Sequence, residues 1–307
     1  MARRRKGVPV HGWVVLDKPL GMSSAQAVAA VRRVFNAEKA GHGGTLDPLA
    51  TGVLPVALGE ATKTVSYVMD GAKTYRFALR WCEATETDDS EGRVVATGDV
   101  RPDASAIRAV LPQFTGTIRQ TPPAYSALKI EGERAYDLAR AGAPVTLAAR
   151  EVRIDRLTLI ACPDPDHAEF EAEVGKGTYI RALGRDLAVA LGTVAHVSAL
   201  RRLAVGRFRA ERAISLENLA LLGQSAAASE HLLPIETALD DIPALALTAA
   251  EAAFLKHGRP VSSVSDRMRS GGLQEGTTVC ATEGGRLVAL AKIESGELRP
   301  VRVMSFD

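Results

Sequence analysis

The fold-determining stretch of the chain is GHGGTLDPLATG, residues 41–52. It holds four glycines and a proline, a composition that excludes a regular helix or strand. Glycines let backbone approach a ligand closely, and Asp47 followed by Pro48 fixes a carboxylate in a constrained turn. Local chemistry alone favours a simpler role for Asp47 as a helix N-cap, with Pro48 at the first helical position. A phosphate-binding loop is a further alternative, weakened because the Gly-Lys-Ser/Thr ending of a Walker loop is missing.

Apolar patterns on both sides of this loop predict strands. Residues 12–17 and 53–58 are apolar runs of strand length. Residues 73–81 and 168–174 alternate between apolar and polar side chains, as half-buried strands do. The sequence therefore predicts an α+β fold, in which a mixed and largely antiparallel sheet has helices on its flanks.

Helical spacing predicts three helices in the same region. Ser23 or Ser24 is expected to cap a helix whose apolar stripe runs from Val28 to Phe35, and Thr178 to cap one that starts before Arg181. An exposed helix is expected over residues 133–140.

The last part of the chain predicts a separate small module. Residues 223–231, GQSAAASEH, are typical of a connection, and a helix followed by short strands is expected from Leu247 onward. We therefore expect a main domain over residues 1–240 and a small β-rich domain over residues 241–307.

Composition is that of an ordinary soluble globular protein, with 46% hydrophobic and 24% charged residues. No apolar run approaches the ~20 residues that span a bilayer, so we expect no membrane segment. The start, MARRRKGVPVHGW, has no apolar stretch after its charges and is not expected to be a secretory signal. The three cysteines are far apart, which argues against a zinc site or a disulfide framework and fits a reducing cytoplasm.

Charge is unevenly distributed, although the net charge is only +2. Residues 3–6 are all basic, and residues 200–212 carry five arginines against one glutamate, whereas residues 83–91 are acidic. Segregation of this kind can produce a basic face for phosphates, or it can be ordinary solvated surface.

Six motifs, read in order, resemble the TruB family of tRNA pseudouridine-55 synthases. GHGGTLDPLATGVLPVALGEATK is similar to the signature segment of that family. The other five also follow the order of the family: LDKPLGMSS (16–24), KTYRF (73–77), TPPAYSALKIEGERAYDLARAG (121–142), GKGTYIRALGRDL (175–187) and AHVSALRRLAVGRF (195–208). The resemblance covers residues 10–215 strongly and the C-terminal part more loosely.

The resemblance implies a catalytic role for three residues. Asp47 falls on the essential aspartate of the family, and Arg181 on the arginine that pairs with it; the pairing is expected to be bidentate. Tyr179 matches an active-site tyrosine that lies beside the edge of the target base. On sequence alone, Arg181 would be a surface residue in the first turn of its helix.

Substrate-binding residues are implied in the same way. Tyr75 would stack on the flipped uracil, and Tyr179 would lie beside its edge. Leu200 would pack against the target nucleotide, and His42 would lie against the RNA. Lys18 is expected to support the loop. Without the resemblance, Tyr75 and Leu200 would be core residues.

The implied activity is isomerisation of uridine to pseudouridine at position 55 in the T-loop of tRNA, by base flipping and without a cofactor or a metal. The resemblance also implies an insertion over residues 119–142 that grips the T-loop, a PUA-like RNA-binding domain at the C-terminus, a monomeric state and no protein partner. A non-catalytic RNA-binding or folding protein on the same scaffold is the alternative. Two residues depart from the family pattern, Gly43 in place of Thr and Glu86 in place of Asp.

Overall fold

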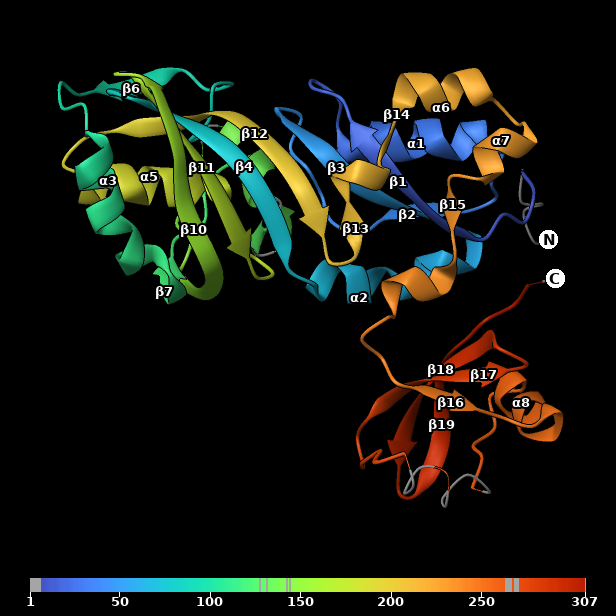
Figure 1. Ribbon diagram of the computed structural model, residues 1–307. Helices are drawn as coiled ribbons and strands as arrows, with labels where there is room; N and C mark the ends of the chain where they lie inside the picture. The colour runs from blue at the N-terminus through green and yellow to red at the C-terminus, as the bar shows by residue number, and fades with distance from the viewer. Residues whose placement is uncertain are drawn as a thin grey trace.

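The computed structural model describes residues 7–126, 128–130, 132–141, 143, 145–262, 267 and 271–306. Its largest element is a mixed sheet with the strand order β14-β1-β3-β12-β4-β11-β10-β7, to which β2, β13 and β15 add at the sides (Figure 1). The strands of this sheet are β1 Gly12–Lys18, β2 Ala40–His42, β3 Ala50–Leu58, β4 Lys73–Trp81, β7 Gly116–Gln120, β10 Arg150–Asp164, β11 His167–Val174, β12 Ala195–Val205, β13 Phe208–Arg209, β14 Ile214–Ser215 and β15 Leu232–Leu233.

Most neighbouring strands in this sheet run antiparallel, while β3 with β12 and β1 with β14 run parallel. The predicted mixed, largely antiparallel sheet is confirmed. Two short hairpins lie outside it, β5 Glu83–Thr85 with β6 Val94–Thr97 and β8 Lys129–Ile130 with β9 Glu133–Arg134.

Helices flank the sheet. They are α1 Ser24–Val34, α2 Val65–Asp70, α3 Ala104–Val110, α4 Ala135–Arg140, α5 Ile180–Ala190, α6 Leu216–Leu222, α7 Ala226–Ser229 and α8 Ala249–Lys256, with 3-10 turns η1 Gly59–Thr64, η2 Leu111–Phe114, η3 Ala210–Arg212 and η4 Ile235–Ala238. None of the helices in the described part of the chain is long and apolar enough to cross a membrane.

One core fills the helix-covered face of the sheet. Alternate residues of β4 and β11, such as Phe77 and Phe170, are buried there and stack with ring centres 5.2 Å apart. The helices contribute Val31 and Leu183 to the same cluster. The intervening residues of β11 are His167 and three glutamates, which face away, so the alternation read from the sequence is the one observed in the sheet.

β1 is buried on both faces, and this explains why its residues 13–16 are all apolar. Val14 and Leu16 join the first core, whereas Trp13 and Val15 join a second core on the opposite face. The second core also includes residues of the C-terminal part, such as Cys280.

The C-terminal part forms its own four-stranded sheet, in the order β16-β17-β18-β19, and lies below the large sheet in Figure 1. Its strands are β16 Ala244–Ala246, β17 Thr278–Glu283, β18 Arg286–Glu294 and β19 Glu297–Val303. Together with α8 it encloses a third core. A small C-terminal β domain was expected, and it is confirmed.

Three local expectations are wrong. Strands β2 and β3 take up both ends of the 41–52 segment, so only its middle is irregular. The N-cap of α5 is Tyr179 and not Thr178, whose hydroxyl donates to the Gly175 carbonyl instead. Helix α4 begins at Ala135, because the two residues before it pair in the β8–β9 hairpin.

Candidate active site

Asp47 lies in the irregular segment between β2 and β3, and no helix follows it. The N-cap interpretation of Asp47 is therefore wrong. The Ala50 amide donates to the Asp47 carbonyl at 3.0 Å, which closes a turn and leads directly into β3. The Asp47 side chain is 39% exposed. The loop thus exposes the carboxylate of Asp47 to solvent, while the hydrogen bond from Ala50 fixes its backbone.

Lys18 supports the Asp47 loop through hydrogen bonds to backbone carbonyls, as expected. Its side chain is fully buried, and the ammonium donates to the carbonyls of Pro19, Met22 and Pro48, at 2.9, 2.7 and 3.4 Å. Burial lowers the pKa of Lys18, while the negative charge of Asp47 acts in the opposite direction. The lysine therefore links the end of β1 to the residue after Asp47.

Ser24 fixes the residue before Asp47. The Ser24 hydroxyl donates to the Leu46 carbonyl at 2.9 Å and accepts from the Leu46 amide at 2.8 Å. Helix α1, which begins at Ser24, is itself capped by a reciprocal Ser23–Gln26 capping box. A well-anchored helix end thus holds Leu46.

Arg202 is buried, although it belongs to the basic stretch over residues 200–212. It is 1% exposed and cannot face phosphate. Its guanidinium donates to the carbonyls of Gly44, Thr45 and Val53, at 2.9, 3.3 and 2.8 Å. Arg202 therefore clamps the two ends of the Asp47 segment together from β12. The burial of Arg202 could have been inferred from its position in the strand, where its side chain faces the core.

Arg181 lies in the first turn of α5 and is buried, against the sequence-based expectation of a surface residue. Its Nη2 atom lies 2.9 Å from Oδ2 of Asp47. The expected bidentate geometry is not observed, because the rest of the guanidinium binds elsewhere. Nη1 donates to the Thr87 carbonyl and Nη2 to the Tyr125 carbonyl, both at 2.9 Å. Arg181 thus joins α5 to three separate loops.

Asp89 also contacts Arg181, and sequence reasoning missed it. The Asp89 residue is 2% exposed, with Oδ2 3.5 Å from Nε of Arg181. Its other oxygen accepts from the Thr87 hydroxyl at 2.6 Å and from the Glu91 amide at 3.0 Å. The sequence analysis noted Asp89 only as part of the acidic stretch over residues 83–91. A buried charge is retained only when it is paired, so Asp89 and Arg181 are best described as one unit.

A second arginine of α5 binds the same segment. Nη1 of Arg185 lies 2.8 Å from Oδ2 of Asp88, and Nη2 donates to the Thr121 carbonyl at 2.8 Å. Burial raises the pKa of Asp88, although Arg185 and Arg181 oppose this effect. Successive turns of α5 therefore hold both the 83–91 segment and the start of the 121–126 loop.

Tyr179 immediately precedes α5. Its amide donates to Oε1 of Gln120 at 2.8 Å, and its carbonyl accepts from Nε2 of the same side chain at 3.1 Å. The guanidinium carbon of Arg150 lies 5.2 Å from the centre of the Tyr179 ring. The ring is half-buried, so part of it is available to a ligand.

The other predicted substrate-binding residues lie on the strands around the loop. Leu200 is 8% exposed in β12 and pairs with Ala50, three residues beyond Asp47. Tyr75 is half-buried in β4 and pairs with Arg202. Asp47 and Arg181 are the two predicted site residues that the described structure joins by an ion pair.

His42 ends β2, and its Nδ1 atom accepts from the Gly44 amide at 3.3 Å. Burial lowers the pKa of His42, and the positive charge of Arg202 adds to this effect, so the imidazole is neutral at pH 7. Gly43 beside it donates to the Pro55 carbonyl, and a Cβ there would lie 2.5 Å from Cγ1 of Val68. Gly43 therefore belongs to a tightly packed segment. Glu86, the other departure, forms an exposed ion pair with Arg93.

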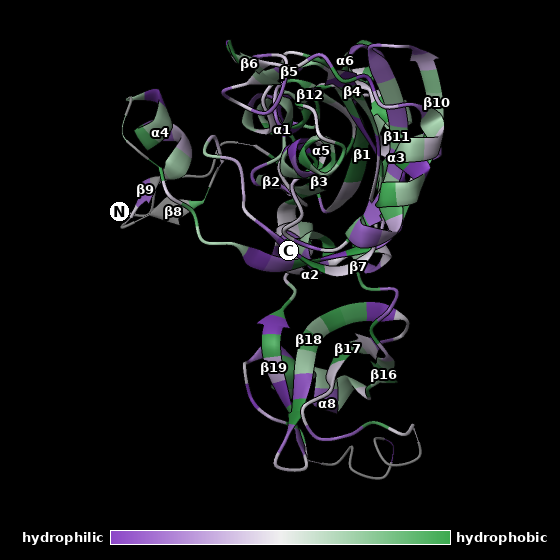
Figure 2. Ribbon diagram, turned by 90° about the vertical axis from the view of Figure 1, so that its left-hand side faces the viewer, coloured by the Kyte–Doolittle hydropathy of each residue, from purple (hydrophilic) through white to green (hydrophobic). Residues whose placement is uncertain are grey.

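The predicted arm over residues 119–142 contains β8, β9 and α4, which stand apart from the main body in Figure 2. Arg119 is exposed, and Arg140 lies over the ring of Tyr136 at 5.3 Å. The side chains of Lys129 and Arg134, and the basic residues 3–6, lie outside the described part of the structure.

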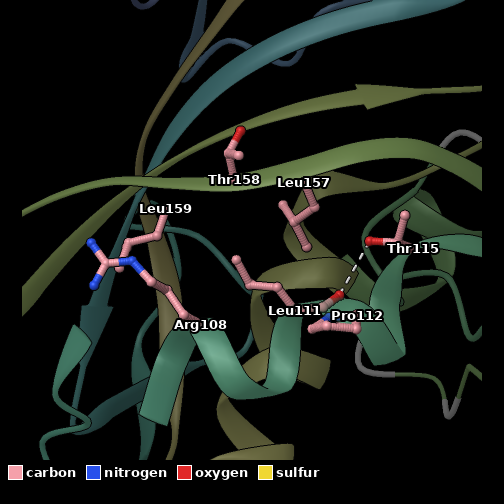
Figure 3. Close-up of a pocket in the computed structure, with 7 residues that line it drawn as sticks. All are labelled: Arg108, Leu111, Pro112, Thr115, Leu157, Thr158 and Leu159. Carbon is pink, nitrogen blue, oxygen red and sulfur yellow. Dashed lines mark hydrogen bonds between the residues drawn. The ribbon is translucent and has the colours of Figure 1, made fainter. Parts of the chain in front are cut away.

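A hollow of about 640 Å³ lies elsewhere, between α3, η2 and β10 (Figure 3). None of the predicted site residues lines it. Its lining is Arg108, Leu111, Pro112, Thr115, Leu157, Thr158 and Leu159.

Two solved structures share the fold of this chain over its whole length. A chain from the crystal structure of a Cbf5–Nop10–Gar1 complex matches with a TM-score of 0.72 and 27% identity, covering 100% of this chain and 91% of that one. A chain from the archaeal box H/ACA sRNP Nop10–Cbf5 complex matches with a TM-score of 0.71 and 26% identity, covering 100% and 94%. The fold is therefore that of a pseudouridine synthase.

Sequence comparisons define the family. The model for the N-terminal domain of TruB family pseudouridylate synthase matches residues 32–180, and the model for the tRNA pseudouridylate synthase B C-terminal domain matches residues 181–240. The tRNA pseudouridine synthase B of Rhodospirillum rubrum is 57% identical over 307 residues, which is 99% of this chain and 100% of the relative. That of Caulobacter sp. is 54% identical and covers 99% of both. The chain belongs to the TruB family, and it is an isomerase that acts on uridine in tRNA.

Proposed function

We propose that this isomerase converts the uridine at position 55, in the T-loop of tRNA, and that Asp47 is the carboxylate that does so. One observation carries the assignment of Asp47. Its carboxylate is 39% exposed and is held at 2.9 Å by Arg181, whose side chain is only 6% exposed. A carboxylate that is open to substrate but held by a buried cation stays oriented and accessible.

The reaction explains why one carboxylate can suffice. The N1–C1′ bond of uridine breaks, a C5–C1′ bond forms, and the proton on C5 leaves while N1 gains one. No electrons are exchanged, so the chemistry needs no redox cofactor. A carboxylate can act on the ribose–base unit as nucleophile or as base. Glycoside hydrolases use two carboxylates, one of which can activate water, and in this isomerisation water must be kept out instead.

The remaining site residues are assigned to the flipped nucleotide. Tyr75 would stack on the uracil, Tyr179 would lie beside its edge, and Leu200 would pack against the nucleotide. His42 would lie against the RNA as a neutral imidazole, which its lowered pKa supports. Tyr75 and Tyr179 are both half-buried, and this leaves ring surface for such contacts.

Recognition of the T-loop is assigned to the parts outside the catalytic core. The domains proposed are a catalytic domain over residues 1–240, with the arm at 119–142, and a PUA-like RNA-binding domain over 241–307. The exposed Arg119 supports phosphate contact by the arm. With tRNA as the substrate, we place the enzyme in the cytoplasm, acting as a monomer without a protein partner.

Tritium release from 5-tritiated uridine in a T-arm transcript tests the proposal directly, because C5 must lose its hydrogen when the new carbon–carbon bond forms. Release at the rate of product formation, abolished when the target uridine is replaced by cytidine, supports position 55. A chain that binds the transcript without releasing tritium would instead be an RNA-binding or folding protein on this scaffold.

A further inference from the structure

Tyr179 is held by two residues of the neighbouring strands, Gln120 and Arg150. We propose that both are positioning residues, with Gln120 fixing the backbone of Tyr179 and Arg150 fixing its ring. The proposal rests on the active-site role proposed for Tyr179, and it adds the side chains that set where this tyrosine lies.

Gln120 is the last residue of β7 and is 1% exposed. Its amide group binds both polar backbone atoms of Tyr179, accepting from the N–H at 2.8 Å and donating to the carbonyl at 3.1 Å. The same carbonyl accepts the first helical hydrogen bond of α5, from the Leu183 amide at 3.0 Å. One side chain therefore fixes the peptide groups on both sides of the Tyr179 α-carbon.

The start of α5 explains why an external clamp is needed. Tyr179 is the N-cap of this helix, and it makes no side-chain cap hydrogen bond. Serine, threonine, aspartate or asparagine usually occupy this position, because their short side chains satisfy the free amides of the first turn. A tyrosine whose ring points toward a substrate cannot accept from these amides. Gln120 immobilises the position from outside the helix instead.

Arg150 acts on the other part of the residue. It lies directly opposite Gln120 in the register between β7 and β10, two strands that lie side by side in Figure 1. Its guanidinium carbon is 5.2 Å from the centre of the Tyr179 ring, within the range of a cation–π contact. Nη2 of Arg150 also donates to the carbonyl of Gly177, in the turn that leads into α5. The cross-strand pair thus holds Tyr179 from two directions.

The same pair lies at the base of the arm. Gln120 is followed by the 121–126 loop, in which the Tyr125 carbonyl accepts from Arg181. Because Tyr179 and Arg181 are two residues apart on the same turn, a shift of Tyr179 would also disturb the cation that holds Asp47. Loss of the clamp should therefore slow the chemical step more than it weakens RNA binding.

Gln120→Met tests the proposal, since methionine has a similar length but neither donates nor accepts as an amide does. The matched control is Asp103→Ala, which removes the side chain that accepts from the Ala106 amide at the N-cap of α3, away from the site. Each variant is assayed for single-turnover tritium release and for T-arm affinity. Each is also labelled with 3-fluorotyrosine, which gives a fluorine resonance for each of the five tyrosines. The Tyr179 resonance is assigned as the one absent from Tyr179→Phe.

The expected result is that Gln120→Met slows single turnover roughly tenfold or more, with T-arm affinity changed less than about twofold, because misplacing a reacting group costs rate. The Tyr179 resonance should move in this variant and in Arg150→Met, and stay unmoved in Asp103→Ala. Gln120→Glu is the second variant; it keeps the acceptor for the Tyr179 amide, loses the donor, and should shift the resonance less than methionine does.

An unmoved Tyr179 resonance in both Gln120 variants, with a rate equal to that of Asp103→Ala, would overturn the proposal. Normal turnover by Tyr179→Ala would instead remove the active-site role of Tyr179, while the resonance shifts would still establish the positioning by Gln120 and Arg150. The two failures are therefore distinguishable.

Discussion

Arg181 and Asp47 form an ion pair whose two members differ in exposure. The arginine side chain is 6% exposed and the aspartate side chain 39%, with 2.9 Å between Nη2 and Oδ2. The guanidinium of Arg181 is shielded from water. It donates to the carbonyls of Thr87 and Tyr125 and forms an ion pair with the buried Asp89. The fixed part of the site is therefore the arginine, and the part open to substrate is the carboxylate.

Arg181→Lys should slow turnover on the order of 100-fold while leaving the protein folded. Lysine keeps the charge, but a single ammonium cannot reach Asp47, Thr87 and Tyr125 together. Single-turnover tritium release and thermal unfolding measure the two effects. Normal turnover by this variant would mean that the guanidinium geometry is irrelevant to the reaction.

Arg202→Met should lower the free energy of unfolding by about 2–3 kcal/mol, because it removes the donor to the buried carbonyl of Val53 and to the part-buried carbonyl of Gly44. Turnover should fall as well, since the segment that carries Asp47 loses its clamp. Denaturant unfolding and tritium release are the measurements. The control is Arg201→Met, which removes a half-exposed ion pair with Asp17 and should cost less than about 1 kcal/mol.

Lys73 gives the folded state a distinct pH dependence. Burial, with a smaller effect from Arg202, lowers its pKa from 10.5 to about 8. Between these pH values the unfolded chain holds a proton that the folded chain has released, so this group makes the free energy of unfolding rise with pH.

The difference in unfolding free energy between wild type and Lys73→Met isolates this effect. It should rise from pH 8 to pH 10.5 by up to about 3 kcal/mol, at ~1.4 kcal/mol for each pKa unit. Cys280, whose pKa burial raises to about 11, acts in the opposite direction but is common to both proteins. A difference that stays constant over this range would show that Lys73 is not desolvated in solution.

Deleting residues 247–307 should weaken tRNA binding and flatten its salt dependence, because phosphate contacts that release counterions are lost. The shared core adds a second consequence. Leu287, Leu290 and Met304 pack in the same cluster as Trp13, so the deletion exposes that face and should lower the unfolding free energy by about 2–5 kcal/mol. Single turnover at saturating enzyme, measured at a temperature where the truncated chain is folded, should change little. Loss of the chemical step by a folded truncation would contradict this division.

Alternating strands were predictable from the sequence because burial on one face imposes a period of two, and β4 spans the predicted residues 73–81. The helix beginning at Ser24 was also predictable, because a capping serine is a local signal in the sequence. The resemblance predicted the pair of Arg181 with Asp47. It did not predict the contacts of Arg181 with the Thr87 carbonyl, the Tyr125 carbonyl and Asp89, because neither charge nor spacing in the sequence reports such pairings. Arg202 was counted with a basic surface, and Asp89 was noted only as part of an acidic stretch. A count of charges along the sequence does not distinguish a solvated ion from one that is paired in the core.

Asp47→Asn gives the most direct test of the central claim, that this carboxylate performs the isomerisation. Asparagine keeps the shape but is a poor nucleophile and a poor base, so single-turnover tritium release should fall by at least ~100-fold. T-arm affinity should stay within a few-fold of wild type, since RNA binding is spread over many phosphate contacts. Tritium release near the wild-type rate by the purified Asn variant would contradict the account.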